Sequence, residues 1–167
     1  MPAGDRTRVT VRLLTEPDID TVIRVWHLSK QEAYPYLPLE QGRTVEEDAA
    51  FFRAHVIPGA TVWVAETDGE IAGFLALEGD YIDRLYVLPE LQRRGVGEAL
   101  LYTAIAESPT GVWLHTHQQN DRARAFYEKH NFHVVRLGIS PPPESAPDVE
   151  YRRDPQSEDR VPAYVES

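Results

Sequence analysis

Residues 92–98 place two glycines and two arginines between a strand-like run and an apolar, helix-like run, in the order Gln92-Arg93-Arg94-Gly95-Val96-Gly97-Glu98. The N–H groups at the start of a helix lack intrahelical partners and attract anions. Gly95 and Gly97 let an anion approach the main chain closely, and Arg93 and Arg94 add positive charge. The segment therefore predicts a site for a phosphate-bearing ligand, and a pyrophosphate fits it better than a single carboxylate.

Two common phosphate-binding motifs do not fit this segment. The dinucleotide-binding motif needs a third small residue three positions after Gly97, where this chain has Leu100. A P-loop needs lysine and then serine or threonine after its last glycine, where the chain has Glu98 and Ala99. The glycines and arginines therefore indicate a different phosphate-binding arrangement.

A second group of polar residues follows at His115-Thr116-His117-Gln118-Gln119-Asn120 and at Tyr127. Asn120 and Tyr127 are seven positions apart, which is two helical turns, so both can face the same cleft. His115 and His117 alternate onto one face of a strand. The chain has no cysteine and no convincingly spaced third ligand, so we expect no metal site.

The surrounding pattern predicts an α/β fold that could position these residues. Strands are expected at 9–13, 61–67, 70–77, 81–87, 112–117, 132–139 and 148–153, and helices after Thr15, at 44–56, at 98–107 and after Asn120. Asp68-Gly69 marks a hairpin, and the strand, helix, strand order of 81–117 predicts a parallel crossover. Residues 30–43, with two prolines and a glycine, are expected to be irregular and to form either a binding loop or a loop packed over the core.

Gln92 to Gly97 matches the Gln/Arg-x-x-Gly-x-Gly/Ala motif of the GCN5-related N-acetyltransferase (GNAT) family, and the chain resembles this family from about Val9 to Arg153. The resemblance implies a single-domain fold with a mixed central sheet of about seven strands, four helices and a V-shaped splay between the fourth and fifth strands. It also implies transfer of an acetyl group from acetyl-CoA to a primary amine. The amine would attack directly in a ternary complex, since the chain has no cysteine to form an acyl intermediate.

The resemblance also implies roles for individual residues. The cofactor-binding residues would be Leu85, Tyr86 and Val87 through their main chain, the cradle Arg93, Arg94, Gly95, Val96, Gly97 and Glu98 at the pyrophosphate, and Asn120 at the pantetheine arm. An N–H near Val87 would polarise the thioester carbonyl, and Tyr127 would donate a proton to the leaving thiolate. Without the other motifs, Tyr127 would be interpreted as a core residue and Asn120 as a helix cap.

His115 is the first choice for the general base that takes the proton of the amine, because imidazole titrates close to neutral pH. It lies five residues before Asn120, where some members of the family carry a catalytic glutamate. Glu78 and Asp83 are the alternatives. Tyr81 stands where another branch of the family has its base glutamate, so that version of the site is absent here.

The acceptor is expected to be a small-molecule amine, with a protein N-terminus or lysine as the alternative. Trp26, Tyr34 and Tyr36 could line an aromatic pocket, and Glu78 could attract the amine. An interpretation from a different class is a catalytically silent module that binds coenzyme A as a sensor.

The length of 167 residues predicts one acetyltransferase domain, 1–154, followed by an acidic tail, 155–167. A net charge of −10 argues against nucleic-acid binding, and the chain has no apolar run long enough to span a membrane. We therefore expect a cytoplasmic protein, and a homodimer is also expected.

Overall fold

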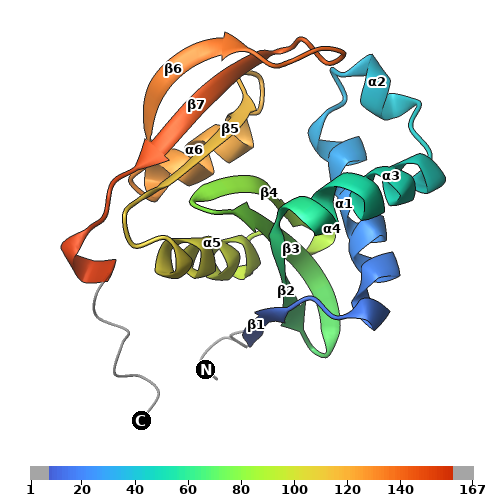
Figure 1. The fold of residues 1–167 in the computed structure, drawn as a ribbon, viewed down its shortest axis with the longest axis horizontal. Helices are drawn as coiled ribbons and strands as arrows, with labels where there is room; N and C mark the ends of the chain where they lie inside the picture. The colour runs from blue at the N-terminus through green and yellow to red at the C-terminus, as the bar shows by residue number, and fades with distance from the viewer. Residues whose placement is uncertain (1–7, 160–167) are drawn as a thin grey trace, which may run out of the picture. The chain divides into compact units, whose positions relative to one another are not determined.

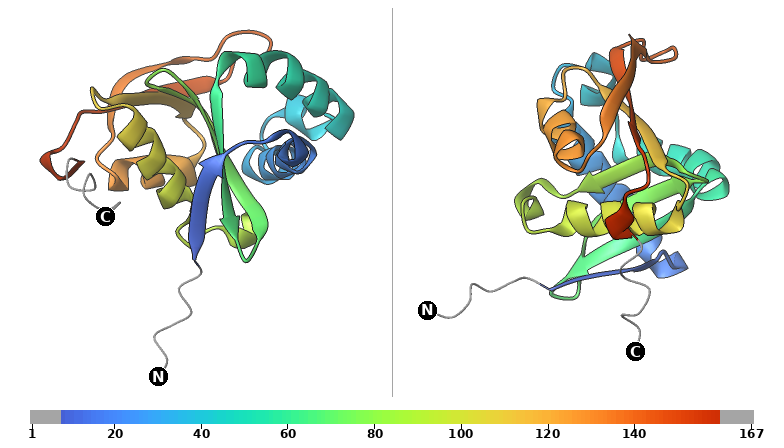
Figure 2. Two further views of the ribbon diagram at one scale, coloured as in Figure 1. Left: turned by 60° about the horizontal axis from the view of Figure 1, so that its bottom comes forward. Right: turned by 90° about the vertical axis from the view of Figure 1, so that its left-hand side faces the viewer.

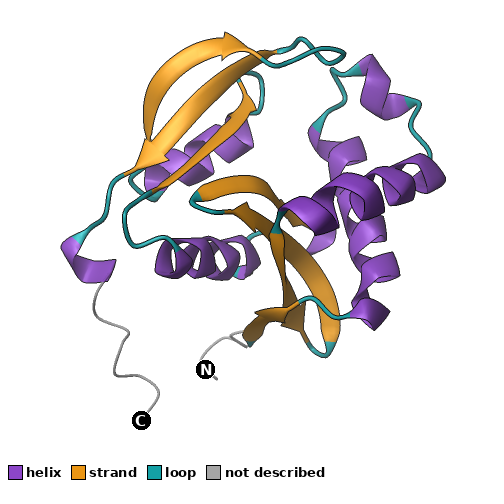
Figure 3. Ribbon diagram, in the orientation of Figure 1, coloured by secondary structure: helices purple, strands orange, loops and turns teal. Residues whose placement is uncertain are grey.

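The computed structural model describes residues 8–159, and their strands form one sheet in the order β1-β2-β3-β4-β5-β7-β6 (Figure 1, Figure 3). The strands are β1 (Val9–Leu13), β2 (Thr61–Thr67), β3 (Glu70–Glu78), β4 (Tyr81–Val87), β5 (Val112–His117), β6 (His133–Ile139) and β7 (Pro147–Arg153). β4 and β5 pair in parallel through Tyr81↔Trp113 and Ile82↔Leu114, whereas β1–β2, β2–β3, β5–β7 and β6–β7 pair antiparallel. The predicted mixed sheet of seven strands is confirmed, and its parallel ladder of two residue pairs is short, as the expected splay requires.

The helices follow the predicted order. They are α1 (Ile19–Ala33), α2 (Pro38–Gln41), α3 (Val45–Phe51), α4 (Ile57–Gly59), α5 (Val96–Glu107) and α6 (Asp121–Lys129). A π-helical turn, η2 (Phe52–Val56), joins α3 to α4, so this stretch continues to Gly59. Thr44 and Glu47 form a capping box at the start of α3, as their spacing predicts.

Residues 30–43 contain more regular structure than predicted. α1 continues through Ala33, and α2 occupies Pro38–Gln41, so the expectation of an irregular segment was wrong at both places and the four predicted helices omitted α2. Lysine, glutamine, glutamate and alanine at 30–33 all favour helix, and Pro38 stands in the first turn of α2, where its missing N–H breaks no intrahelical bond. The irregular parts are 34–37 and 42–44.

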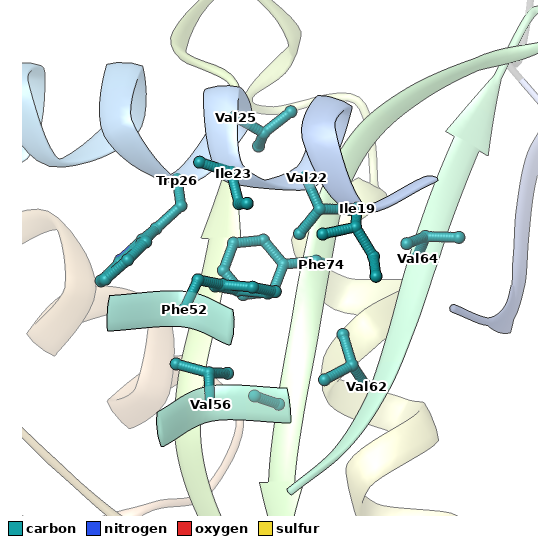
Figure 4. Packing of buried hydrophobic residues seen from close by; sticks show 11 residues of the cluster. Ile19, Val22, Ile23, Val25, Trp26, Phe52, Val56, Val62, Val64 and Phe74 are labelled. Carbon is teal, nitrogen blue, oxygen red and sulfur yellow. The ribbon is translucent and has the colours of Figure 1, made fainter. Parts of the chain in front are cut away.

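By packing, the described residues fall into two compact units, one of residues 8–78 and 83–103 and the other of residues 79–82 and 104–159. In the first unit, α1 and the α3–α4 stretch pack on β2 and β3, and Figure 4 shows their apolar side chains facing one another. The buried cluster comprises Ile19, Val22, Ile23, Val25, Trp26, Phe52, Val56, Val62, Val64, Phe74 and Ala76. The spacing of the α1 members follows one helical face.

The opposite face of β3 packs against α5. A Cβ built on Gly73 would lie 3.3 Å from a Leu100 side-chain atom and only 2.5 Å from the main-chain oxygen of Tyr86. Because that oxygen is backbone and cannot swing away, only glycine allows β4 and α5 to approach β3 this closely. In Figure 2 (left), α5 and α1 lie on opposite sides of β2 and β3.

Buried charges connect α1, α2 and α3. Lys30 Nζ lies 2.9 Å from Asp48 Oδ1 and 3.0 Å from Glu40 Oε2, and Lys30 and Asp48 are 2% and 0% exposed. Asp48 also contacts His27 Nδ1 at 2.8 Å and Arg43. Burial acts to raise the pKa of Asp48, but the hydrogen bonds that the carboxylate accepts, the one from Lys30 first, hold its pKa below the usual range.

In the second unit, α6 covers one face of β5 and β7. Leu114 and Tyr151 are cross-strand partners and both are buried, and the Tyr151 hydroxyl is held between Arg124 Nε at 3.0 Å and Glu128 Oε2 at 2.5 Å, both on α6. α6 lies beside these strands in the views of Figure 1 and Figure 2. Side chains alternate along a strand, so the neighbours of Leu114 along β5 point to the other face.

Of the predicted tail, the structure describes residues 155–159, and residues 160–167 lie outside the described range. Residues 157–159 form a short helical turn, in which Asp159 Oδ2 accepts the Gln156 N–H at 2.8 Å and pairs with Arg153 Nη1 at 2.8 Å. The beginning of this segment is therefore tied to β7. Within the described part of the chain, no helix combines the length and the apolar character needed to cross a membrane.

Replacing Asp48 by alanine is expected to lower the free energy of unfolding by about 3–5 kcal/mol, because Lys30 would stay buried without this carboxylate. Chemical denaturation at neutral pH measures the loss. The matched control is Asp20→Ala, which removes an ion pair with Arg53 in which the Asp20 side chain is 80% exposed. The control should cost no more than about 1 kcal/mol, and equal losses would show that the buried cluster contributes no more than a surface pair.

Candidate active site

The glycine-arginine segment forms a turn at the start of α5, as predicted. Gly95 has a φ of +84°, and a Cβ built on it would meet no atom within 4 Å, so the space above this residue is open. Arg93 also has a positive φ, of +67°, and Arg93 and Arg94 are exposed. The Val96 side chain is buried at 1% exposure, so Val96 can offer a ligand only its main chain. An open turn with two exposed arginines fits an anion.

Gln92, the first residue of the motif, holds this turn onto the end of β4. Its Nε2 donates to the Val87 carbonyl at 3.2 Å, and Ser29 Oγ of α1 donates to the same oxygen at 3.2 Å. The next N–H, that of Leu88, donates to the Ala72 carbonyl at 2.8 Å. Three hydrogen bonds therefore hold the end of β4, and the turn at residues 92–95 begins a few residues after this fixed point.

The four predicted acceptor residues separate into different environments of the first unit. Trp26 is 2% exposed, and Lys30 Nζ lies 3.8 Å from its ring centroid, so the structure places Trp26 in the core. Tyr34 and Tyr36 lie together with ring centroids 6.0 Å apart, and the Tyr34 hydroxyl is 3.1 Å from that of Tyr86.

Glu78 is the last residue of β3 and is exposed. The ring of Tyr86 stacks on Phe74 at 5.8 Å, and burial raises the pKa of its hydroxyl. Leu85 and Tyr86 are half-buried residues of β4 whose main chain, rather than their side chains, was predicted to bind the cofactor.

In the second unit, Asn120 begins α6 and Tyr127 lies in its last turns. Asn120 Oδ1 accepts the Ala123 N–H at 3.1 Å, so the residue does cap the helix. Tyr127 is 7% exposed and packs its ring against Phe132 at 5.3 Å and Tyr151 at 6.3 Å. Tyr127 thus lies on the α6 side of the β5–β7 ladder.

His115 lies on the opposite face of the same ladder. Its Nδ1 is 3.0 Å from the Tyr81 hydroxyl, and its Nε2 is 3.6 Å from Glu150 Oε1. The His115 side chain is 36% exposed. Trp113, two residues earlier on β5, packs its ring 4.4 Å from that of Tyr81 and donates its indole N–H to Asp80 at 3.0 Å. His115 is therefore accessible and held among aromatic and acidic neighbours.

Sequence reasoning missed three members of this group: Tyr81, Trp113 and Glu150. The register explains the grouping, because Tyr81 is the partner of Trp113 and Glu150 is the partner of His115, and cross-strand partners share a face. Alternation in each strand was visible in the sequence, but the pairing register was not. Asp83, an alternative base, lies next to Arg84 Nε at 3.4 Å in the other unit.

The open turn at Gly95, with Arg93 and Arg94 exposed beside it, fits the pyrophosphate of acetyl-CoA. Among the described residues, no group of three or more His, Asp or Glu side chains could hold a metal ion. His117 lies two residues after His115 on β5. Its Nε2 is 2.7 Å from Oε1 of Glu144, in the loop between β6 and β7.

Comparison with known proteins identifies the family. Residues 23–132 match the model of the acetyltransferase (GNAT) family. Peptidyl-lysine N-acetyltransferase YjaB of Salmonella typhimurium is 29% identical over 128 residues, which cover 76% of this chain and 85% of that protein.

Solved structures agree on the fold. The solution structure of apo-form YjaB from Escherichia coli has a TM-score of 0.74 at 22% identity, covering 89% of this chain and 99% of that one. The structure of yncA from Salmonella typhimurium, with its cofactor acetyl-CoA, has a TM-score of 0.64 at 16% identity, covering 89% of this chain and 95% of that one. This chain therefore belongs to the GNAT acetyltransferase family and is an N-acetyltransferase that uses acetyl-CoA as its acyl donor.

Proposed function

We propose that the acceptor is the ε-amino group of a lysine side chain presented by a protein or peptide. The observation that carries this proposal is the exposed face of β4, β5 and β7 around His115, where aromatic rings and carboxylates lie together. The name of the relative YjaB, a peptidyl-lysine N-acetyltransferase, points to the same acceptor.

The chemistry of this face suits a lysine side chain. The rings of Tyr81 and Trp113 offer apolar and π surface to an extended methylene chain and its ammonium group. Glu150 and Asp80 provide negative charge beside these rings, and the chain as a whole carries a net charge of −10. These charges attract a cationic segment and raise its local concentration.

The proposed catalytic groups lie on opposite faces of the β5–β7 ladder. His115 would accept the proton of the amine on the exposed face, and Tyr127, on the α6 side, would donate a proton to the leaving thiolate. An acyl transfer requires a base for the nucleophile and an acid for the leaving group.

The cofactor contacts are also proposals. The cradle Arg93 to Glu98 would hold the pyrophosphate, the main chain of Leu85, Tyr86 and Val87 would bind the pantetheine arm, and Asn120 would add a side-chain contact. The Val87 carbonyl accepts two side-chain hydrogen bonds, which hold the main chain at this end of β4 in place. A main chain held in this way supports the proposed role of β4 in cofactor binding.

The acceptor experiment distinguishes the lysine proposal from three alternatives: a small-molecule amine, a protein N-terminus, and a silent module that binds coenzyme A. The homodimer and the cytoplasmic location stay predictions. Four exposed apolar side chains on the edge strand β6, Val134, Val135, Leu137 and Ile139, support the dimer.

Thiol release from acetyl-CoA should be fastest with peptides that contain an internal lysine and a blocked N-terminus. The matched control is the same peptide with the lysine replaced by arginine, and free amines and unblocked lysine-free peptides form the other arms. Preference for either of these arms would replace the lysine proposal with a small-molecule or N-terminal acceptor. Binding of acetyl-CoA without transfer in any arm would favour the sensor module.

Replacing Tyr127 by phenylalanine is expected to lower kcat on the order of 10²-fold, because general acid catalysis contributes about that much. The dissociation constant of acetyl-CoA, measured by calorimetry, should stay within about twofold, since only a hydroxyl is removed. Tyr102→Phe on the exposed face of α5 is the control and should keep wild-type kcat. An unchanged kcat in Tyr127→Phe would remove this hydroxyl from the mechanism.

Replacing Gly95 by alanine is expected to weaken acetyl-CoA binding about tenfold, because the added Cβ enters the open space above the turn where the pyrophosphate would lie. Gly69 is the matched control: its φ is +78° and its Cβ would also meet nothing within 4 Å, but it lies in the β2–β3 hairpin. Both variants should lose similar stability on thermal unfolding. Equal acetyl-CoA affinity in the two variants would contradict a cradle at Gly95.

A further inference from the structure

Both ring nitrogens of His115 are engaged by neighbours, and this arrangement determines how it could act as a base. Nε2 faces the Glu150 carboxylate at 3.6 Å, and an ionised carboxylate only accepts hydrogen bonds. This contact is too long for a hydrogen bond, but the negative charge of the carboxylate favours the neutral tautomer that carries its hydrogen on Nε2. Nδ1 then carries the lone pair and accepts the hydroxyl hydrogen of Tyr81, whose oxygen is 3.0 Å away.

We infer that Tyr81, rather than His115, contacts the acceptor amine, and that the three side chains Tyr81, His115 and Glu150 form a proton relay. This inference rests on the proposed amine-binding role of the exposed face. A phenol oxygen that donates its hydrogen to Nδ1 keeps its lone pairs as acceptors, so it can receive a proton from an ammonium group. Tyr81 is thus the catalytic residue of the relay, and His115 and Glu150 are positioning and charge-stabilising residues.

The proton balance of the relay closes. The ammonium group gives one proton to Tyr81 Oη while the Tyr81 hydroxyl gives its own to His115 Nδ1. The imidazolium formed is stabilised by the Glu150 carboxylate. The freed amine attacks the acetyl carbonyl, so that a C–N bond forms and the C–S bond breaks. The acid Tyr127 gives its proton to the thiolate, and the second proton that the nitrogen loses as the amide forms passes through solvent and restores the Tyr127 hydroxyl. His115 then returns its proton to solvent through the exposed side of its ring.

The fold holds these groups rigidly. Tyr81 and Trp113 are partners in the parallel ladder, His115 and Glu150 are partners in the antiparallel one, and all belong to one compact unit. The His115 ring packs 5.7 Å from both the Tyr81 and Trp113 rings, which limits its rotation.

Other charged groups lie on this face or beside it. The register places Arg152 beside Trp113, and Arg152 Nε pairs with Asp154 at 3.2 Å. Arg136 of β6 is the register partner of Glu150. Asp80 accepts the Trp113 indole N–H. The carboxylate that faces a ring nitrogen of His115 is Glu150.

The test compares Tyr81→Phe, His115→Gln and the double variant in steady-state transfer to the acceptor that wild type prefers. Each single variant should lower kcat on the order of 10²-fold, with the KM for acetyl-CoA unchanged, because general base catalysis contributes about that much. The double variant should lose no more than either single variant, because the residues act as one unit. Tyr102→Phe and His133→Gln are the controls, because they make the same chemical changes outside the relay. Both should keep the kcat of wild type.

The pH profile separates a relay from a structural role. In Tyr81→Phe, kcat should rise about tenfold per pH unit between pH 7 and 9, as the fraction of free amine increases, while wild type rises less. Glu150→Gln should lose on the order of tenfold, since 3.6 Å is an ion-pair contact rather than a hydrogen bond, and Glu107→Gln on the exposed face of α5 is its control.

Three results would overturn the relay: wild-type kcat in Tyr81→Phe, losses that multiply in the double variant, or a pH profile of Tyr81→Phe parallel to that of wild type. If wild type transfers acetyl groups to no amine at all, the proposed function fails instead, and that outcome is visible before any variant is made. Unchanged thermal unfolding of each variant confirms that the fold is kept.

Discussion

The antiparallel pairing of β5 with β7 is the constraint on which the candidate site depends. It places Leu114 opposite Tyr151 and His115 opposite Glu150. Because side chains alternate along each strand, the first pair points to α6 and the second to the exposed face. A register shift of one residue would bury His115 and expose Leu114, and it is opposed by the burial of Tyr151, whose hydroxyl is held by Arg124 and Glu128. The same packing that stabilises this unit therefore orients the polar group.

A second constraint acts in the other unit, where the end of β4 is held before the cradle begins. Ser29 and Gln92 both donate to the Val87 carbonyl, and Gly73 allows the main chain of β4 to approach β3. The buried pair of Lys30 and Asp48 ties α1 to α3 and limits where α2 can lie. Burying polar groups costs free energy unless they are hydrogen-bonded, and burying charges costs more unless they are paired. In this unit Ser29 and Gln92 are hydrogen-bonded, and Lys30 and Asp48 are paired with each other.

The separation of Tyr127 from His115 gives the two proposed proton-transfer groups different surroundings. Tyr127 is nearly buried among Phe132 and Tyr151, whereas His115 is accessible to solvent. An accessible imidazole can exchange its proton with water. The proposed acid and the proposed base therefore differ in their exposure to solvent.

The sequence by itself determined the family, the acyl donor and nearly all of the elements, because glycine and arginine spacing, strand alternation and helix caps are local signals. Thr44 with Glu47, Asp68-Gly69 and the 92–98 segment all predicted the structure that is found. It missed α2, because the prolines of 30–43 were interpreted as breakers although Pro38 opens a helix.

Only the tertiary structure decided which side chains surround His115 and that Trp26 belongs to the core. Those answers depend on the register between strands distant in the sequence, such as β5 and β7, and on which face each helix covers. Neither is encoded in the spacing of neighbouring residues.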